Sequence, residues 1–279
     1  MAYKSLLCVV TDFDYCRAAL EQAIATASSE DAHLEVLCTG VDLTQVTSYY
    51  AGANAVILQE TISRALQDAE KISEAVSERL EGEAITWSTS TAVAALADLG
   101  RHIAARARFA DLVLLAHPYG DDAGPAHEPI IEASMFEGKA PVMVVPTDGE
   151  PLVAPQKVVI GWNESSEAMS AIRAALPILK QADSVNITVI DPPMHSPNRS
   201  DPGGLLSQFL ARHGVTAEIS VLSKTLPRVS DVLQRHVSDI EADMIVMGAY
   251  GHSRLREAIF GGATRDMMEE AKVPLFLAH

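Results

Sequence analysis

The chain has 279 residues, 48% of them apolar, and a formal net charge of −16. This length and apolar content suffice for two globular domains, and the negative charge argues against nucleic acid or an anionic membrane as the main partner. The sequence contains no run of about 18 apolar residues, so no membrane-spanning helix is predicted. Residues 1–4 lead into a strand-like run without the layout of a signal peptide, and the expected compartment is therefore the cytoplasm.

Short runs rich in Val, Ile and Leu alternate along the chain with stretches of helical periodicity. The strands predicted in the first half are Leu6–Val10, Leu34–Cys38, Ile85–Ser88, Leu112–Ala116 and Val142–Val145. Those predicted in the second half are Val158–Trp162, Asn186–Ile190, Thr216–Val221, Met244–Met247 and Leu275–Leu277. The helices predicted between them are Cys16–Ser28, Thr61–Leu80, Val93–Arg108, Glu164–Gln181, Leu205–His213 and Ser230–Ile240. Nearly continuous apolar strands separated by helices predict parallel sheets that are covered on both faces.

The two halves of the chain resemble each other. Ala110–Ala116 is similar to Ala242–Gly248, and Lys139–Val145 is similar to Lys272–Ala278. These pairs predict two tandem α/β domains, each a five-stranded, doubly wound, Rossmann-like unit with a parallel sheet. The predicted boundaries are 1–146 for the first domain, 147–155 for a turn-rich linker, and 156–279 for the second domain. Ligands of such folds bind beyond the carboxyl ends of the strands, where the strand order reverses.

A glycine-rich segment follows the fourth predicted strand of the second half. It reads Gly248-Ala-Tyr-Gly251, nine further residues, and then Gly261-Gly262-Ala263-Thr264. A strand, a glycine loop and the start of a helix together predict a phosphate site, because backbone N–H groups and the positive end of the helix dipole face the ligand. Neither the dinucleotide-binding glycine fingerprint nor the P-loop pattern can be read here.

These repeats and the glycine segment resemble the universal stress protein family in its tandem two-domain form, over essentially the whole chain. ATP-binding members carry Gly-x-x-Gly, nine residues, and then Gly-Ser or Gly-Thr. Gly248, Gly251 and Gly261 fit this pattern, Gly262 stands where the hydroxyl residue is expected, and Thr264 matches a second hydroxyl position.

The resemblance implies a site for ATP or another adenine nucleotide, with or without Mg²⁺, in the C-terminal domain. Met247 and the amides after it would lie along the ribose and phosphates, the start of the helix at Gly261–Thr264 would hold the phosphates, and Val189 would border the adenine. His252 and Arg254 follow the loop and could neutralise phosphate charge, although solvated helix residues need no such role.

Two departures from the family pattern distinguish the two copies. The family has an aspartate after the first strand, whereas the second copy has Asn163, whose amide oxygen can still accept a hydrogen bond. The first copy keeps Asp12, but its fourth strand runs into a segment without the Gly-x-x-Gly pair, and Pro118 there lacks an N–H donor. We therefore expect nucleotide binding in the C-terminal copy and its loss in the N-terminal copy.

Neither a catalytic constellation nor a metal site is predicted. The spacing of His117, Asp121, Asp122, His127 and Glu128 matches no zinc or calcium pattern, and the acidic residues near Cys16 argue against an activated thiol.

Three functions remain open from the sequence. The favoured one is a regulatory stress protein with an unidentified protein partner. The others are a nucleotide-free interaction module with a decayed site, and a slow ATPase. The resemblance further implies that the final strands of the two copies pair, which would make the chain an intramolecular pseudo-dimer, with or without homodimerisation.

Overall fold

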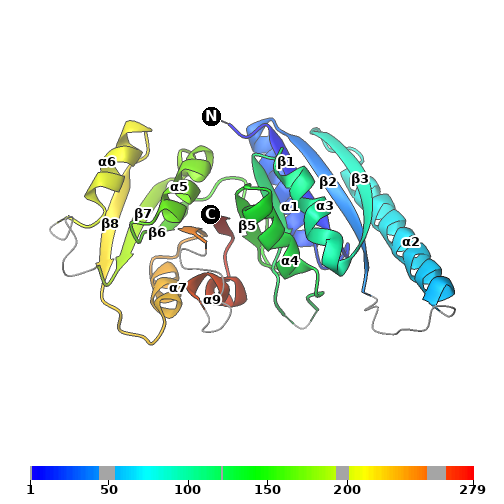
Figure 1. Cartoon of the computed structure of the whole chain (residues 1–279). Coiled ribbons are helices and arrows are strands. Elements are labelled where there is room, and N and C mark those ends of the chain that lie inside the picture. Colours follow the sequence, from blue (N-terminus) through cyan, green and yellow to red (C-terminus); the bar gives the residue numbers. More distant parts are fainter. Residues whose placement is uncertain (1, 44–53, 121, 193–200, 250–261) are drawn as a thin grey trace. The chain divides into compact units, whose positions relative to one another are not determined.

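A computed structural model describes residues 2–43, 54–120, 122–192, 201–249 and 262–279 (Figure 1). The chain divides into two compact units, of which the first contains Tyr3–Ala140 and the second contains Pro141–His279. None of the described helices combines the length and the apolarity needed to cross a membrane.

The N-terminal unit is a doubly wound α/β layer structure. Its elements are β1 (Ser5–Val10), α1 (Arg17–Glu30), β2 (His33–Asp42), α2 (Asn54–Leu80), β3 (Thr86–Ala95), α3 (Leu96–Ala107), β4 (Leu112–Ala116), α4 (His127–Glu132) and a π-helical turn at Ala133–Glu137. The strands run parallel in the order β3-β2-β1-β4. Leu6 of β1 pairs with Leu34 of β2 and with Leu112 of β4, and all three side chains are fully buried. Burial on both faces explains why these strands read as continuous apolar runs.

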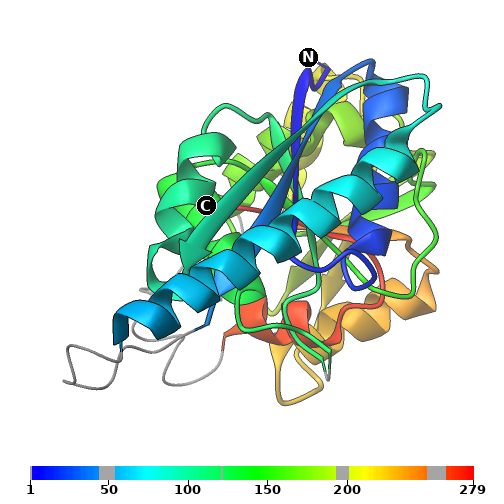
Figure 2. The ribbon, with the colours of Figure 1, turned by 90° about the vertical axis from the view of Figure 1, so that its right-hand side faces the viewer.

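Helix α2 packs along β2 and β3, and Figure 2 looks onto the face that it covers. Gly40 of β2 allows this close approach. A Cβ atom at Gly40 would lie 1.8 Å from the carbonyl oxygen of Ala65 in α2. The absence of a side chain at Gly40 therefore sets the distance between the helix and the sheet.

The C-terminal unit repeats the arrangement. Its elements are β5 (Val142–Val145), β6 (Lys157–Gly161), α5 (Ser166–Leu179), β7 (Ser184–Ile190), α6 (Gly204–Arg212), β8 (Ala217–Leu222), α7 (Val229–Asp239), β9 (Met244–Gly248), α9 (Ala263–Glu270) and β10 (Leu275–Ala278). The strand order is β5-β10-β9-β6-β7-β8, and β6 to β10 run parallel. The predicted α/β class with two tandem doubly wound repeats is confirmed.

Strand β5 departs from the expectation of purely parallel sheets. It is the last strand of the first repeat by sequence, yet it lies in the C-terminal unit and pairs antiparallel with β10, with Met143 opposite Phe276. A parallel neighbour needs a crossover that returns the chain to the same end of the sheet. No single crossover joins β5 to β10, because the whole second repeat lies between them, so they are free to run in opposite directions.

One local prediction was wrong in the first repeat, and one helix there was not predicted. Val93–Ala95 was assigned to a helix, whereas these residues extend β3 and pair with Gly40–Asp42, and the helix begins only at Leu96. Short apolar runs do not distinguish the end of a strand from the start of a helix, and the pairing with the long β2 decides the outcome here. Helix α4 was not predicted, because the segment before it is rich in Gly, Pro and Asp.

Candidate functional site

The strand order of the C-terminal unit reverses between β6 and β9. Gly161 at the end of β6 is in register with Met247 of β9, and from these two strands the chain winds outward in opposite directions. Trp162 and Asn163 follow β6 at this edge, and Ala249 follows β9. Because a doubly wound sheet opens a crevice at such a reversal, this edge is the candidate site.

Gly248 has a packing role that the sequence does not reveal. A Cβ atom at this position would lie 2.3 Å from the backbone nitrogen of Ala168 and 2.6 Å from the carbonyl carbon of Glu167, at the start of α5. The missing side chain therefore lets the end of β9 pack directly against α5. Contact between Gly248 and a ligand stays a prediction.

The backbone groups that follow β9 are partly engaged within the protein. The N–H of Ala249 donates to the carbonyl of Ala278, at 2.9 Å, and the carbonyl oxygen of Ala249 lies 3.1 Å from Nδ1 of His279. The Met247 side chain is buried beside β10, where Met247 pairs with Leu277. Since Ala249 extends the ladder with β10, its amide is not available to a phosphate.

Asn163 orders the turn after β6. Its Oδ1 accepts a hydrogen bond from the backbone N–H of Ser165, at 3.1 Å, and the Ser165 hydroxyl in turn caps α5 by accepting from the N–H of Ala168. Asp12 of the first repeat accepts from the N–H of Tyr15, three residues on, at 2.8 Å. Asn163 and Asp12 thus both accept a backbone N–H in the turn after the first strand, but from different positions, and the Asn163 side chain is exposed at the candidate edge.

Helix α9 begins at the same edge of the sheet. It precedes the parallel strand β10, so it runs back along the sheet and its first turn lies toward the end where the strands finish. Its N-cap residue is Gly262, which is extended and has no side chain with which to cap the helix. Ala263 is exposed, whereas Thr264 is only 3% exposed.

The remaining predicted site residues divide into two groups. Val189 is buried near the end of β7, where it pairs with Val221. Gly251, His252, Arg254 and Gly261 lie outside the described residues. Their roles stay predictions.

An open cavity of about 290 Å³ lies beside the end of β6 and was not predicted. Its lining residues come from the turn after β6 and from the start of α6, and they are Trp162, Glu164, Asp201, Gly203, Leu205 and Leu206. The volume is close to the lower end of the range for small-molecule sites. The sequence carried one usable signal, since Trp162 directly precedes Asn163 at the end of a predicted strand.

The matching edge of the N-terminal unit is filled by its own side chains. Nδ1 of His127, at the start of α4, lies 3.0 Å from the carbonyl oxygen of Gly124, which can only accept, so Nδ1 carries the proton. Nε2 is then an acceptor, and it lies 3.1 Å from Thr11 Oγ1 and 3.8 Å from Cys16 Sγ. Burial lowers the pKa of His127 and raises the pKa of the Cys16 thiol. His127 is therefore a neutral, buried hydrogen-bond acceptor for β1 and α1.

Tyr15 closes this edge further. Its hydroxyl donates to the carbonyl of His117 at 2.7 Å, and its ring centroid lies 4.7 Å from that of His127. The Tyr119 hydroxyl donates to Glu128. Among the described residues no three His, Cys, Asp or Glu side chains gather as metal ligands, and Asp121 lies outside that part of the chain.

Two tandem doubly wound repeats define the class of this α/β protein. Residues 155–279 match the universal stress protein family. This sequence match covers the second half of the chain, which contains most of the C-terminal unit.

Three relatives place the chain by fold and sequence. A universal stress protein from Archaeoglobus fulgidus DSM 4304 has a similar structure, with a TM-score of 0.73 and 14% identity, covering 98% of this chain and 96% of that one. A functionally unknown protein from Pseudomonas aeruginosa PAO1 has a TM-score of 0.59 and 15% identity, covering 99% and 92%. The universal stress protein Slr1230 of Synechocystis sp. (strain ATCC 27184 / PCC 6803 / Kazusa) is 26% identical over 72 residues, a match that spans 26% of this chain and 24% of that relative.

Proposed function

We propose that this chain is a cytoplasmic stress-response regulator that binds ATP or another adenine nucleotide, with or without Mg²⁺, in its C-terminal unit. One observation carries the proposal. Helix α9 begins at Gly262 without a capping side chain, on the edge of the sheet where the strand order reverses between β6 and β9. The first N–H groups of a helix have no intrahelical partner, and together with the helix dipole they favour a phosphate.

The neighbouring cavity supports a place for the rest of the ligand. Trp162 and Leu206 give it aromatic and apolar surface, and the exposed Asn163 offers polar groups beside it. A nucleotide that has its phosphates at α9 would place its base toward this side of β6 and the end of β7, where Val189 lies. Because the proposed site supplies anion-binding groups and no assigned general base, binding would shift a conformational or partner equilibrium rather than drive turnover.

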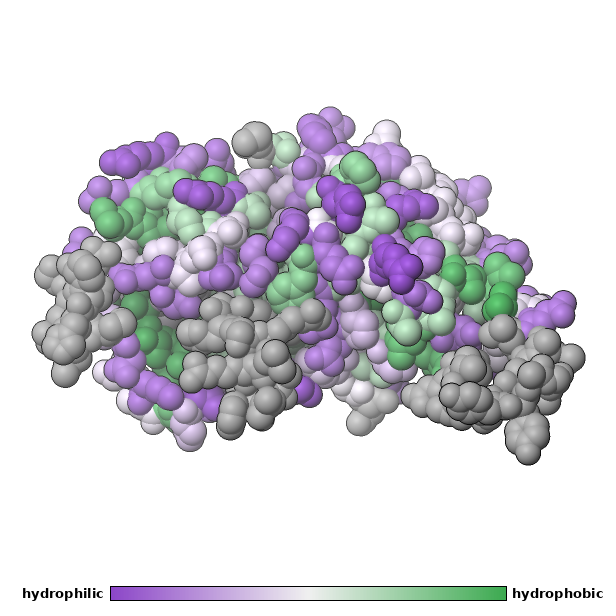
Figure 3. All heavy atoms as spheres, in the orientation of Figure 1, coloured by the Kyte–Doolittle hydropathy of each residue, from purple (hydrophilic) through white to green (hydrophobic). Residues whose placement is uncertain are grey.

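The nucleotide-free interaction module is the second candidate, and the engaged amide of Ala249 favours it. Exposed apolar residues of the described part include Phe109, Val153 and Leu205, which come from three different segments. On the face that Figure 3 draws, hydrophobic areas lie among hydrophilic ones. The antiparallel pairing of β5 with β10 supports an intramolecular pseudo-dimer under either candidate.

Native mass spectrometry of the full chain with ATP and Mg²⁺ tests the proposal. We expect one adenine nucleotide per chain, because the N-terminal edge is filled by Tyr15 and His127. Two nucleotides per chain would show that this edge opens. No nucleotide at millimolar ATP would overturn the proposal and favour the interaction module.

A matched pair of substitutions at Gly262 locates the ligand. Asp and Ser are both good N-cap residues, and the extended backbone of Gly262 accepts either. Gly262→Asp places a carboxylate where the phosphates are expected, so we expect ATP affinity to fall at least about tenfold while the free energy of unfolding is kept or raised. Gly262→Ser is uncharged and should retain binding. Calorimetric titration that shows equal affinity for both variants would place the phosphates elsewhere.

A further inference from the structure

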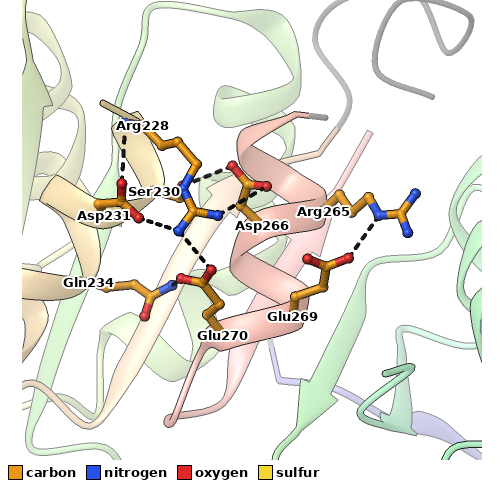
Figure 4. A network of polar contacts seen from close by, with 8 residues as sticks. All are labelled: Arg228, Ser230, Asp231, Gln234, Arg265, Asp266, Glu269 and Glu270. Atoms are coloured by element: carbon orange, nitrogen blue, oxygen red, sulfur yellow. Dashed lines mark hydrogen bonds and ion pairs between the residues drawn. The ribbon is translucent and has the colours of Figure 1, made fainter. Parts of the chain in front are cut away.

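A single guanidinium joins the start of α7 to both turns of α9. Arg228 is the residue before α7, and its Nη2 lies 2.6 Å from Oδ1 of Asp231 and 2.7 Å from Oε1 of Glu270, while its Nη1 lies 3.6 Å from Oδ1 of Asp266 (Figure 4). The hydrogen bonds that Arg228 donates to Asp231 and Glu270 raise the pKa of Arg228, so it stays charged. One cation is thus shared by one carboxylate of α7 and two of α9.

Asp266 occupies a critical position in this network. It lies in the first turn of α9, and its backbone N–H donates to the carbonyl of Gly262 at 3.0 Å. A carboxylate in the first turn of a helix interacts favourably with the positive end of the dipole, and it therefore competes with an anionic ligand for that end. Arg228 and the hydroxyl of Ser230, which donates to Oδ2 of Asp266 at 3.1 Å, hold this carboxylate against α7.

The network also fixes α9 against α7. Glu270, one turn beyond Asp266, is bound by Arg228 and by Gln234 Nε2, at 3.3 Å, so contacts along both turns of α9 reach α7. The Arg265–Glu269 pair, at 2.9 Å, lies within α9 and Figure 4 shows it on the side away from Arg228. The two arginines near this helix thus differ in what they do, since Arg228 joins two helices and Arg265 pairs along one.

We infer that Arg228 is a positioning residue for an anionic ligand at the start of α9. It offsets part of the negative charge of Asp266 and holds α9 in place, and so reduces the competition of this carboxylate with a phosphate group for the positive end of the helix. The inference rests on the proposed function, because it assumes that the ligand's phosphates lie at Gly262. It adds that affinity for the phosphates depends on a residue that is not required to touch them.

A charge-rescue experiment tests this role. We expect Arg228→Ala to weaken binding of ATP with Mg²⁺ about tenfold, because the uncompensated Asp266 then repels the phosphates. Adding Asp266→Asn to Arg228→Ala should restore most of the affinity, since it removes the unmasked charge. Arg265→Ala removes one positive charge from α9 itself and should weaken binding less. Affinities are measured by calorimetric titration, and urea unfolding of each variant reports stability separately.

The possible outcomes distinguish a failure of the role inferred for Arg228 from a failure of the proposed function. If the wild-type chain binds ATP and Arg228→Ala binds it equally well, the inference is overturned and the proposed function stands. If the double variant binds as weakly as Arg228→Ala, masking of Asp266 is not the mechanism, and the inference is likewise overturned. If the wild-type chain binds no nucleotide, both the proposed function and the inference about Arg228 are overturned.

Discussion

Gly248→Ala is expected to lower the free energy of unfolding of the C-terminal unit by about 3 kcal/mol, the upper part of the usual range for overpacking. The added Cβ would lie 2.3 Å from the nitrogen of Ala168 and 2.8 Å from its Cα. These are backbone atoms at the start of α5, so rotation of a side chain cannot relieve the clash. Either β9 or the first turn of α5 has to move.

The chain offers its own reporters and a control for this measurement. Its two tryptophans are Trp87 in β3 and Trp162 after β6, one in each unit. In a Trp87→Phe background, urea unfolding followed by fluorescence reports on the C-terminal unit. Gly149→Ala is the control, because the nearest atom to its added Cβ is the Pro146 oxygen at 3.8 Å. Equal midpoints for the Gly248 and Gly149 variants would show that Gly248 is not needed for packing.

The bounds of a strand were predictable where both faces of the strand are buried. The structure has β4 at Leu112–Ala116 and β5 at Val142–Val145, with the bounds that the apolar runs predict. A strand covered on both faces must be apolar at every position, and turn-forming residues at its ends then mark its limits. The internal repeat made the tandem organisation predictable, because the same pattern of strands and helices occurs twice in the sequence.

The partners of these strands were not predictable from local pattern. An apolar run does not record which strand lies beside it, so the placement of β5 beside β10 and within the C-terminal unit follows from tertiary structure. The same reason explains the error at Val93–Ala95, where ten paired positions between β2 and β3 outweigh helical periodicity.

The candidate site stays a prediction, and its details depend on tertiary structure. The order of strand, glycines and helix predicts a site at the edge that contains Gly248 and Gly262, since doubly wound folds use that edge. Glycine permits close approach of a ligand and close packing of a helix equally well, so the sequence cannot separate these roles at Gly248. The geometry assigns packing there, and the engaged amide of Ala249 and the cavity beside Trp162 depend on contacts between distant segments.

The N-terminal unit is expected to lose stability as the pH falls from 7.5 to 5, with His127 responsible for a resolvable part of the loss. Burial lowers the pKa of His127 in the folded state, whereas in the unfolded chain the group titrates near its ordinary value of about 6.5. The unfolded state therefore binds the proton more readily. The stabilising contribution is fully present above pH 6.5 and is lost as the pH falls toward the lowered pKa of the folded state.

The surroundings of His127 support this direction. Its side chain is 6% exposed, and the groups facing it are the Gly124 carbonyl, the Thr11 hydroxyl, the Cys16 thiol and the Tyr15 ring. The hydrogen bond to the Gly124 carbonyl and the nearby charge of Asp12 oppose the shift, since both raise the pKa of His127, but burial is the larger effect. A proton on Nε2 would place a cation in a buried site where Nε2 now accepts hydrogen bonds.

His127→Gln isolates the effect of this one group. Glutamine cannot titrate and keeps both a donor and an acceptor, so the variant should lose about 1–2 kcal/mol at pH 7.5 from imperfect hydrogen bonds and show a weaker pH dependence than the wild type. His102→Gln, at an exposed position of α3, is the matched control. The measurement is urea unfolding at several pH values in a Trp162→Phe background, with Trp87 as the reporter of the N-terminal unit. If the free energy of unfolding depends on pH in His127→Gln as it does in the wild type, other groups are responsible for that dependence. His127 would then not be the neutral hydrogen-bond acceptor of this edge.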